Sequence, residues 1–281
     1  MNAPRHGYAI AIALIAACGG GRTSPATQPS PAAFDAAASD PKAVAAVDQM
    51  LAALGGAAEW DKVKQIRWEQ RYTRDGKMMA LFRHAWDRWN ARHRYEEVNL
   101  ASMEKAKREG RPQDIEVTVG MYEIFDHQGK GSATHDGQML GTEARDKIVA
   151  SAFKAWQSDS YRLTAIYKVK DPGVKLTHKG VMQPVKEFCK PTCEMIEVSF
   201  APEVGKDVWF IAINSQSKMP DVLEKQMPDG KLGFGLSGWT TVGALKFPTK
   251  FENLGMSESF EISDIKIGEP EDDLYIPTVG E

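Results

Sequence analysis

Two histidines, His84 and His93, are the first candidates for a chemical site because the sequence predicts that they face each other. Each lies in a stretch where apolar and polar residues alternate, and residues 87–90 between the stretches have the composition of a turn. In a hairpin closed by this turn, His84 opposes His93 and Phe82 opposes Tyr95. A zinc site needs three or four protein ligands, and no further ligand can be assigned. We therefore expect a polar pair on an aromatic sheet face, with no metal or other cofactor bound.

A second candidate is the pair Cys189 and Cys193, which three residues separate. This spacing is one residue longer than in the Cys-x-x-Cys redox motif. A disulfide across the tip of a hairpin, which would stabilise the fold by about 2 kcal/mol for so small a loop, is favoured over two free thiols.

Catalytic motifs are otherwise lacking in the sequence. The Gly-Leu-Ser-Gly stretch at 235–238 is one residue short of a nucleophile elbow and is not placed between a strand and a helix. Ser132, His135 and Asp136 are too close in sequence to fold into a triad. The sequence therefore does not predict an enzyme, although an enzyme that uses His84 and His93 remains an alternative.

Aromatic residues recur at alternating positions of the predicted strands, and the chain contains twelve methionines. A large curved sheet needs side chains that fill its concave face, and methionine suits both irregular cores and adaptable apolar pockets. One interpretation is ordinary core packing. The other is a cavity for acyl chains such as palmitate, partly covered by helices. The candidate ligand-binding residues are Trp68, Tyr72, Phe82, Trp86 and Tyr95.

The elements that must position these residues are mostly short strands. One helix is predicted from the N-cap Asp40 to the glycines 55–56, and a second over 143–157, whereas 99–113 is predicted as a polar, solvated loop. Tight turns separate the remaining segments, which favours one curved antiparallel sheet or barrel of about ten or eleven strands. Twelve segments have a strand pattern and are the candidates for these strands: 63–74, 78–86, 91–98, 115–121, 161–169, 174–188, 193–200, 207–214, 219–227, 231–238, 243–253 and 257–267.

The N-terminus has the pattern of an export signal. A short segment containing Arg5 precedes the apolar block 8–17, which is too short to span a bilayer. The block ends in Leu-Ile-Ala-Ala before Cys18 and resembles the bacterial lipobox, which implies that Cys18 carries a diacylglyceryl group after cleavage. An ordinary secretory signal is the alternative. With Cys18 lipidated, the other two of the three cysteines pair in an oxidising compartment.

Composition divides the chain into three parts: a signal peptide over 1–17, the lipidated cysteine with a flexible linker over 18–41, and one folded domain over 42–281. The linker is rich in Gly, Pro, Ser and Ala and lacks apolar residues that could form a core. Gly19 after the cysteine resembles an outer-membrane address, so we expect an anchor in the outer membrane facing the periplasm. The net charge of −3 gives no basic surface for nucleic acid.

The order of elements resembles the LolA/LolB-like superfamily of outer-membrane lipoprotein-sorting domains over roughly residues 43–277. The resemblance lies in the helix end at 52–57, the first strand at 63–76, the turn at 171–174, Trp209, and the segments 243–249, 262–267 and 273–277. It implies a mainly β fold, an unclosed antiparallel β-barrel with a small helical lid over a cavity for lipid. No functional residue of the family can be matched to a position here.

These observations predict a membrane-anchored periplasmic lipoprotein that binds lipid, an acylated protein or another apolar ligand in a half-barrel cavity, with a role in lipoprotein sorting. The alternative is a structural or interaction lipoprotein whose interior is packed and whose surface docks a protein of the cell envelope. An accessible apolar cavity favours the first hypothesis, and a filled interior favours the second.

Overall fold

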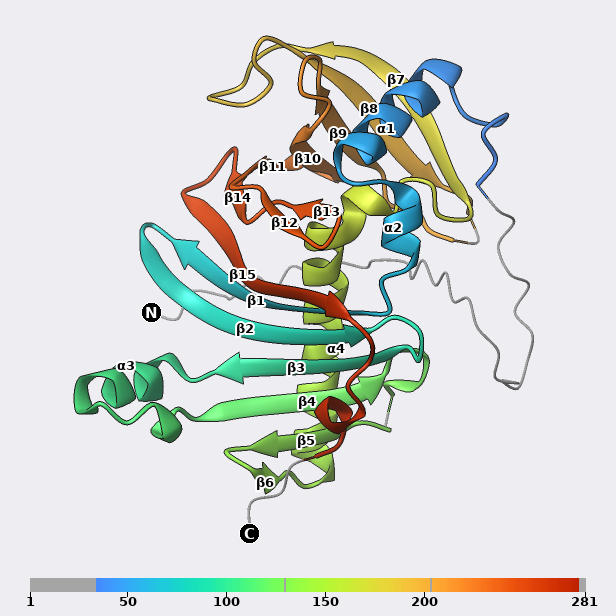
Figure 1. Cartoon of the computed structure of the whole chain (residues 1–281). Helices are drawn as coiled ribbons and strands as arrows, with labels where there is room; N and C mark the ends of the chain where they lie inside the picture. Colours follow the sequence, from blue (N-terminus) through green and yellow to red (C-terminus); the bar gives the residue numbers. More distant parts are fainter. Residues whose placement is uncertain (1–33, 129, 203, 278–281) are drawn as a thin grey trace.

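The structure, a computed structural model, describes residues 34–128, 130–202 and 204–277 (Figure 1). The predicted signal peptide, Cys18 and most of the predicted linker lie outside the described residues. Within the described ranges, no helix combines the length and the apolar composition needed to cross a membrane.

The described residues are organised around one large antiparallel sheet. Thirteen strands form it in the order β6-β5-β4-β3-β2-β1-β15-β14-β11-β10-β9-β8-β7, and β12 and β13 pair separately. The two outermost strands, β6 and β7, do not pair with each other, so the sheet is curved but unclosed (Figure 1). The predicted mainly β, unclosed architecture is thereby confirmed.

The strands are β1 (Gln65–Arg74), β2 (Lys77–Asp87), β3 (Arg92–Val98), β4 (Val117–Glu123), β5 (Ser132–His135), β6 (Gln138–Met139), β7 (Val174–Met182), β8 (Cys193–Phe200), β9 (Trp209–Asn214), β10 (Pro220–Met227), β11 (Gly230–Ser237), β12 (Thr240–Val242), β13 (Leu245–Phe247), β14 (Lys250–Asn253) and β15 (Glu258–Gly268). The predicted number of ten or eleven strands was too low. Several strands, such as β6 and β12, have only two or three residues and therefore no period that a sequence pattern could reveal.

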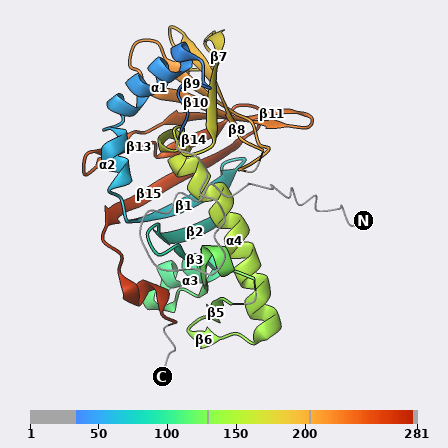
Figure 2. The same ribbon diagram turned by 90° about the vertical axis from the view of Figure 1, so that its right-hand side faces the viewer.

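In the described part of the chain, four α-helices accompany the sheet: α1 (Pro41–Ala53), α2 (Ala57–Asp61), α3 (Leu100–Glu109) and α4 (Thr142–Thr164). Helix α1 packs against β7 and β9, and α4 runs across the strands of the other half of the sheet (Figure 2). Short 3-10 helices lie at Pro112–Asp114, Ile124–Asp126, Ala165–Tyr167 and Asp272–Tyr275. We call the face that packs against α1 and α4 the inner face, because the main hydrophobic core lies there.

Two predicted elements were wrong. The segment predicted as a polar loop contains α3, whose N-cap Asn99 accepts hydrogen bonds from the N–H groups of Ala101 and Ser102 and whose end is capped by Gly110 in the left-handed region. The strand predicted at 161–169 is the end of α4 and a 3-10 turn. In α4, Trp156, Ser160 and Leu163 are buried at helical spacing, and this period continues the helix seven residues beyond the predicted end at 157.

Gly55 connects α1 to α2 at a point where no side chain fits. Its φ is +111°, and a Cβ there would overlap the carbonyl oxygen of Ala244. Gly56 is a matched control because its φ is also positive, +102°, but no atom lies within 4 Å of the place where its Cβ would be.

We expect Gly55→Ala to lower the free energy of unfolding by about 1–3 kcal/mol more than Gly56→Ala, since only the first adds a steric overlap to the backbone strain. Urea unfolding of the two variants measures this difference. Equal losses of unfolding free energy in the two variants would show that the backbone at Ala244 can move away from the new Cβ at position 55 without a free-energy cost.

Candidate functional site

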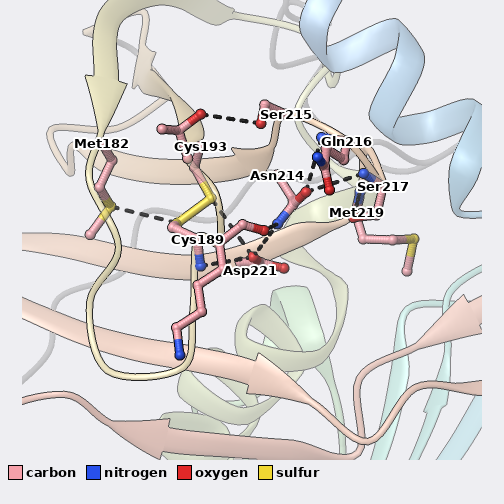
Figure 3. Close-up of a disulfide and its surroundings, with 11 residues drawn as sticks. Met182, Cys189, Cys193, Asn214, Ser215, Gln216, Ser217, Met219 and Asp221 are labelled. Atoms are coloured by element: carbon pink, nitrogen blue, oxygen red, sulfur yellow. Dashed lines mark hydrogen bonds between the residues drawn. A yellow bond between two sulfur atoms is a disulfide. The ribbon is translucent and has the colours of Figure 1, made fainter.

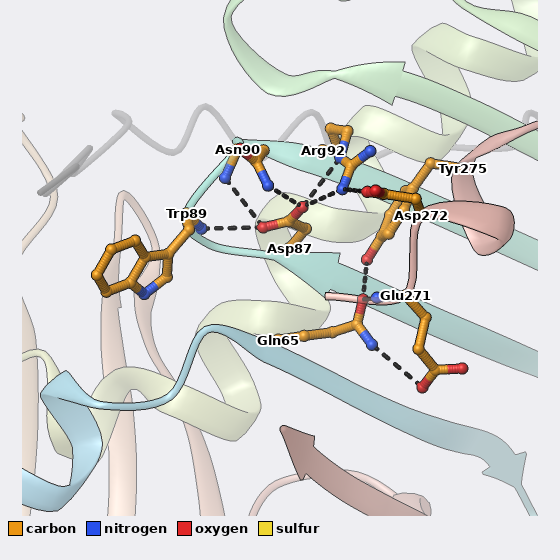
Figure 4. Close-up of polar contacts among 8 residues, drawn as sticks. All are labelled: Gln65, Asp87, Trp89, Asn90, Arg92, Glu271, Asp272 and Tyr275. Atoms are coloured by element: carbon orange, nitrogen blue, oxygen red, sulfur yellow. Dashed lines mark hydrogen bonds and ion pairs between the residues drawn. The ribbon is translucent and has the colours of Figure 1, made fainter. Parts of the chain in front are cut away.

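The hairpin of β2 and β3 places the two histidines on the inner face, but in a register two residues away from the predicted one. His84 pairs with Tyr95, and His93 pairs with Trp86. The reason lies in Asp87, whose carboxylate accepts hydrogen bonds from the N–H groups of Trp89 and Asn90 at 3.1 and 2.9 Å (Figure 4). These contacts extend β2 to Asp87, which pairs with Arg92, so the turn comprises 88–91 and not 87–90.

The histidines nevertheless contact each other across the diagonal of the hairpin. His84 Nδ1 and His93 Nε2 are 3.2 Å apart, and both side chains are buried. The indole of Trp68 on β1 stacks on His84 with 4.4 Å between ring centroids. Tyr122 on β4 approaches His93 edge to face. A zinc site needs three or four protein ligands, and among the described residues His84 and His93 belong to no group of three His, Cys, Asp or Glu side chains whose ligand atoms lie within 4.8 Å of one another.

Helix α4 adds three side chains to this pair, at intervals of three residues along one helix face. Asp159 Oδ2 lies 3.4 Å from His84 Nε2, an ion-pair distance without the alignment of a hydrogen bond. Arg162 donates to Asp159 Oδ1 at 2.7 Å and to Gln70 Oε1 at 3.3 Å. Trp156 packs edge to face on Trp86 with 5.5 Å between centroids.

We call these residues of the sheet and the helix the buried polar cluster. Its members are Trp68, Gln70, His84, His93, Tyr122, Trp156, Asp159 and Arg162.

The buried polar cluster has many polar atoms without a partner. Among the described residues, seven buried side-chain nitrogen and oxygen atoms have no hydrogen-bond partner, and every one belongs to this cluster. They are Trp68 Nε1, Gln70 Nε2, His84 Nε2, His93 Nδ1, Tyr122 OH, Trp156 Nε1 and Arg162 Nε. An unpartnered buried polar group costs about 1–3 kcal/mol, so the contact between the sheet and α4 is less favourable than its burial alone would make it.

Burial and neighbouring charges fix the protonation of the cluster. Burial raises the pKa of Asp159, but the contact with His84 and the charge of Arg162 outweigh this effect, so that pKa is lowered overall and the carboxylate is ionised. Burial, together with the neighbouring His84, holds the pKa of His93 well below its usual range. Burial also raises the pKa of Tyr122. At neutral pH the cluster therefore contains one carboxylate, one guanidinium and an uncharged His93.

The lowered pKa of His93 predicts that the fold loses stability in mild acid. Below pH 6.5, the ordinary pKa, the unfolded chain binds a proton at His93 that the folded chain does not. Stability attributable to His93 is therefore complete above pH 6.5 and falls as the pH decreases, by at most about 1.4 kcal/mol for each pH unit. Urea unfolding between pH 7.5 and 5 measures the slope.

His93→Gln should flatten this slope, whereas replacing the exposed His135 by Gln should leave it unchanged. A slope that persists in His93→Gln would assign the pH dependence to another group.

The five predicted ligand-binding residues lie on the inner face, but the structure does not leave them open. Trp68, Trp86 and Tyr95 are buried, and Phe82 and Tyr72 are half-buried. Helix α4 covers this part of the sheet so closely that a Cβ at Gly120 would lie 3.2 Å from the Cβ of Ala152. The predicted residues thus share one face of the sheet, and three of them are buried there.

A cavity of about 290 Å³ lies on the opposite, outer face of the sheet, between Arg67, Arg83, Arg94 and Leu274. The C-terminal segment crosses this face beside it. Asp272 pairs with Arg92 at 2.6 Å, and the hydroxyl of Tyr275 donates to Gln65 Oε1 at 2.8 Å (Figure 4).

Far from the buried polar cluster, Cys189 and Cys193 are joined by a disulfide in the connection between β7 and β8 (Figure 3). Asp221 lies beside them, accepting hydrogen bonds from the Cys189 N–H at 2.9 Å and from Asn214 Nδ2 at 2.8 Å. The two sulfurs and this carboxylate lie within 4.8 Å of one another. Because the sulfurs are bonded to each other, this group serves to hold the loop and not a metal ion.

The sequence interpretation missed the contribution of α4 to the site. The signal was the spacing of Trp156, Asp159 and Arg162, three residues apart, which places all of them on one helix face. This spacing is recognisable only in a helix that continues past residue 157, whereas the predicted helix ends there.

Neither a protein-family model nor a curated protein sequence matches the chain significantly. Among solved structures, the chain is similar to a LolA superfamily protein from Nitrosomonas europaea, with 11% identity, 83% of this chain and 97% of that chain covered, and a TM-score of 0.41. A putative outer membrane lipoprotein-sorting protein domain from Vibrio parahaemolyticus has 10% identity, 83% and 96% coverage and a TM-score of 0.41. A DUF1329 family protein from Desulfovibrio piger has 9% identity, 83% and 97% coverage and a TM-score of 0.39.

Proposed function

We propose that the chain is a lipid-anchored protein of the bacterial cell envelope that binds lipid, an acylated protein or another apolar ligand between the inner face of its sheet and α4. Cys18 carries the anchor, in the outer membrane facing the periplasm, and an acylated ligand would fit a role in lipoprotein sorting. The proposed activity is binding and not catalysis.

The observation that carries this proposal is the concentration of all seven unpartnered buried atoms at the contact between the sheet and α4. Buried side-chain polar groups are normally hydrogen-bonded, and outside this cluster the buried side-chain nitrogen and oxygen atoms of the described residues are. Polar atoms left without partners where the sheet meets α4 are available to a ligand that enters there. The surrounding residues are aromatic, including Trp86, Phe153 and Phe260, so the ligand is mainly apolar.

Binding requires α4 to move away from the strands it contacts, β3–β5, because three of the predicted ligand-binding residues, Trp68, Trp86 and Tyr95, are buried in the closed arrangement. The movement exchanges aromatic contacts with α4 for contacts with the ligand. Its cost is reduced by the unpartnered atoms, which regain hydrogen bonds when the cover opens.

The second candidate function is an interaction lipoprotein whose inner face is permanently filled and whose outer surface docks an envelope protein. One observation favours it: Trp68, Trp86 and Tyr95 are already covered in the structure. It leaves the seven unpartnered atoms without an explanation.

Native mass spectrometry of the chain purified from a bacterial envelope tests the proposal. We expect adducts at lipid masses that are lost on denaturation, whereas a lipid bonded covalently to Cys18 survives denaturation. A clean mass, without uptake of added diacylglycerol or phospholipid, would reject ligand binding and favour the interaction lipoprotein.

The anchor has a separate test. Cys18→Ser should move the chain from the membrane fraction to the soluble or uncleaved precursor fraction, because two acyl chains are what makes such anchoring stable. Gly19→Asp is the matched control: it should keep the chain in the membrane fraction while changing which membrane holds it. Full membrane retention of a Cys18→Ser chain whose signal peptide has been removed would contradict lipidation at this residue.

A further inference from the structure

The C-terminal segment, residues 269–277, is strongly acidic where it crosses the outer face of the sheet. Its first five residues are Glu-Pro-Glu-Asp-Asp, so four of the five carry a carboxylate. The segment forms the 3-10 turn Asp272–Tyr275, which contacts β3, and it belongs to neither sheet. It is therefore held without the ladder of backbone hydrogen bonds that holds a strand.

Cationic side chains of the outer face meet these carboxylates one by one. The three ion pairs are Lys64–Glu269 at 2.9 Å, Arg67–Glu271 at 2.9 Å and Arg92–Asp272 at 2.6 Å. Figure 4 shows the last of them. Arg94 adds a hydrogen bond from Nη1 to the backbone carbonyl oxygen of Leu274 at 3.1 Å. The outer face at β1 and β3 thus binds both the carboxylates and the backbone of an acidic polypeptide.

The ion pairs hold the segment only weakly. The side chains of Glu269, Glu271 and Asp272 are 76, 57 and 79% exposed. Ion pairs this exposed contribute little to stability and are screened by salt. Tyr275 makes a more protected contact, since its hydroxyl donates to Oε1 of the buried Gln65 at 2.8 Å. A competitor that makes the same contacts can therefore displace the segment.

The C-terminal segment does not fill the outer face. The cavity of about 290 Å³ beside it is lined by four cationic side chains and three carboxylates, and Leu274 is also part of the lining. The cations are Arg67, Arg83, Arg94 and Lys266, and the carboxylates are Glu69, Glu96 and Asp264. Among the described residues, Lys266 takes part in no ion pair. A segment with a carboxylate that reaches Lys266 therefore gains a contact that the chain's own segment does not make.

We propose that the outer face at β1 and β3, together with this cavity, is a binding site for an acidic segment of a partner protein. The C-terminal segment is its intramolecular occupant, and the partner's segment displaces it. A polypeptide is favoured over other polyanions because Arg94 binds a backbone carbonyl oxygen there. The inference does not rest on the proposed function, since the outer face can bind a protein segment whether or not a ligand enters beneath α4.

The probe is a synthetic peptide with the sequence of residues 269–277, labelled with fluorescein at its N-terminus. Fluorescence anisotropy measures its binding to the full chain purified from a bacterial envelope. The variant Glu271→Gln/Asp272→Asn removes two carboxylates from the chain's own segment and so weakens the competitor. We expect the probe to bind this variant about three- to tenfold more tightly than the unaltered chain.

Two controls show that the probe occupies the proposed site. Adding Arg67→Gln to the variant removes a cation that then faces only the probe, and should weaken probe binding about two- to fivefold. Arg71→Gln is the matched control, because Arg71 lies on the same face of β1 but pairs with Glu261, outside the site. It should leave probe binding unchanged. A scrambled peptide of the same composition should bind several-fold more weakly than the probe.

Tighter probe binding to the variant that Arg67→Gln reverses supports the inference. Three results overturn it: no binding of the probe to either chain, equal binding to both, or equal binding of the scrambled peptide, which would reveal attraction between charges alone. Hydrogen exchange in the unaltered chain gives a readout that needs no variant. Residues 269–277 of the chain should exchange faster when the probe is present in excess, and an unchanged rate would make this segment a permanent part of the fold and overturn the inference.

Discussion

Replacing Arg162 by Met should lower the free energy of unfolding by about 3–5 kcal/mol. The substitution leaves the Asp159 carboxylate, only 4% exposed, without the guanidinium that lies 2.7 Å away. A buried charge that loses its partner is among the most destabilising changes in a protein interior.

Replacing both partners, Asp159→Leu with Arg162→Met, should restore the free energy of unfolding to within about 1 kcal/mol of the unaltered chain, since no charge is then buried alone. Urea unfolding of the single and double variants measures the coupling. The exposed pair Glu143 and Lys147 on the same helix provides the control, and Lys147→Met should change stability by less than about 0.5 kcal/mol. A double variant as unstable as the single one would show that packing of Arg162 on Phe260 dominates, and not its charge.

Trp156→Ala should also cost about 3–5 kcal/mol, whereas Trp156→Phe should cost less than about 1 kcal/mol. The alanine variant removes the ring that packs on Trp86, His93 and Phe153 and leaves a cavity beneath α4. The phenylalanine variant retains most of that packing. It removes only an indole N–H that has no partner in the folded chain.

Thermal or urea unfolding of the two Trp156 variants distinguishes packing from hydrogen bonding. A large loss in Trp156→Phe would mean that the indole nitrogen does have a partner, such as a bound water, and would weaken the argument from unpartnered atoms. Similar small losses of unfolding free energy in both variants would mean that α4 moves closer to the sheet in Trp156→Ala and fills the cavity left by the ring.

Much of the fold could be predicted because its hairpins have local signals. Asp75-Gly76, Asp136-Gly137 and Asp229-Gly230 each connect two strands, as the sequence indicated. Two helical segments were missed for different reasons. The polar composition of α3 gave no apolar period, and the apolar residues at the end of α4 fit a strand as readily as a helix.

Less of the site could be predicted, since it depends on contacts between distant parts of the chain. The closeness of His84 and His93 followed from one hairpin, although the bonds made by Asp87 shifted its register by two residues. The contact of Asp159 with His84 joins residues 75 positions apart, and no local pattern specifies it. The C-terminal segment on the outer face was equally inaccessible to sequence reasoning, because Asp272 meets Arg92 across 180 positions.

The position of β15 next to β1 has a consequence for how the chain folds. The first and last strands lie side by side in the middle of the sheet, paired from Gln65 with Gly268 to Arg74 with Glu258. Strands so far apart in sequence pair late, because the long intervening loop must close first. A chain that emerges N-terminus first, as during export, therefore cannot join the two halves of its sheet until the last strand has emerged. We expect the two halves of the sheet to be joined, and the interior between them to close, only when this last strand pairs.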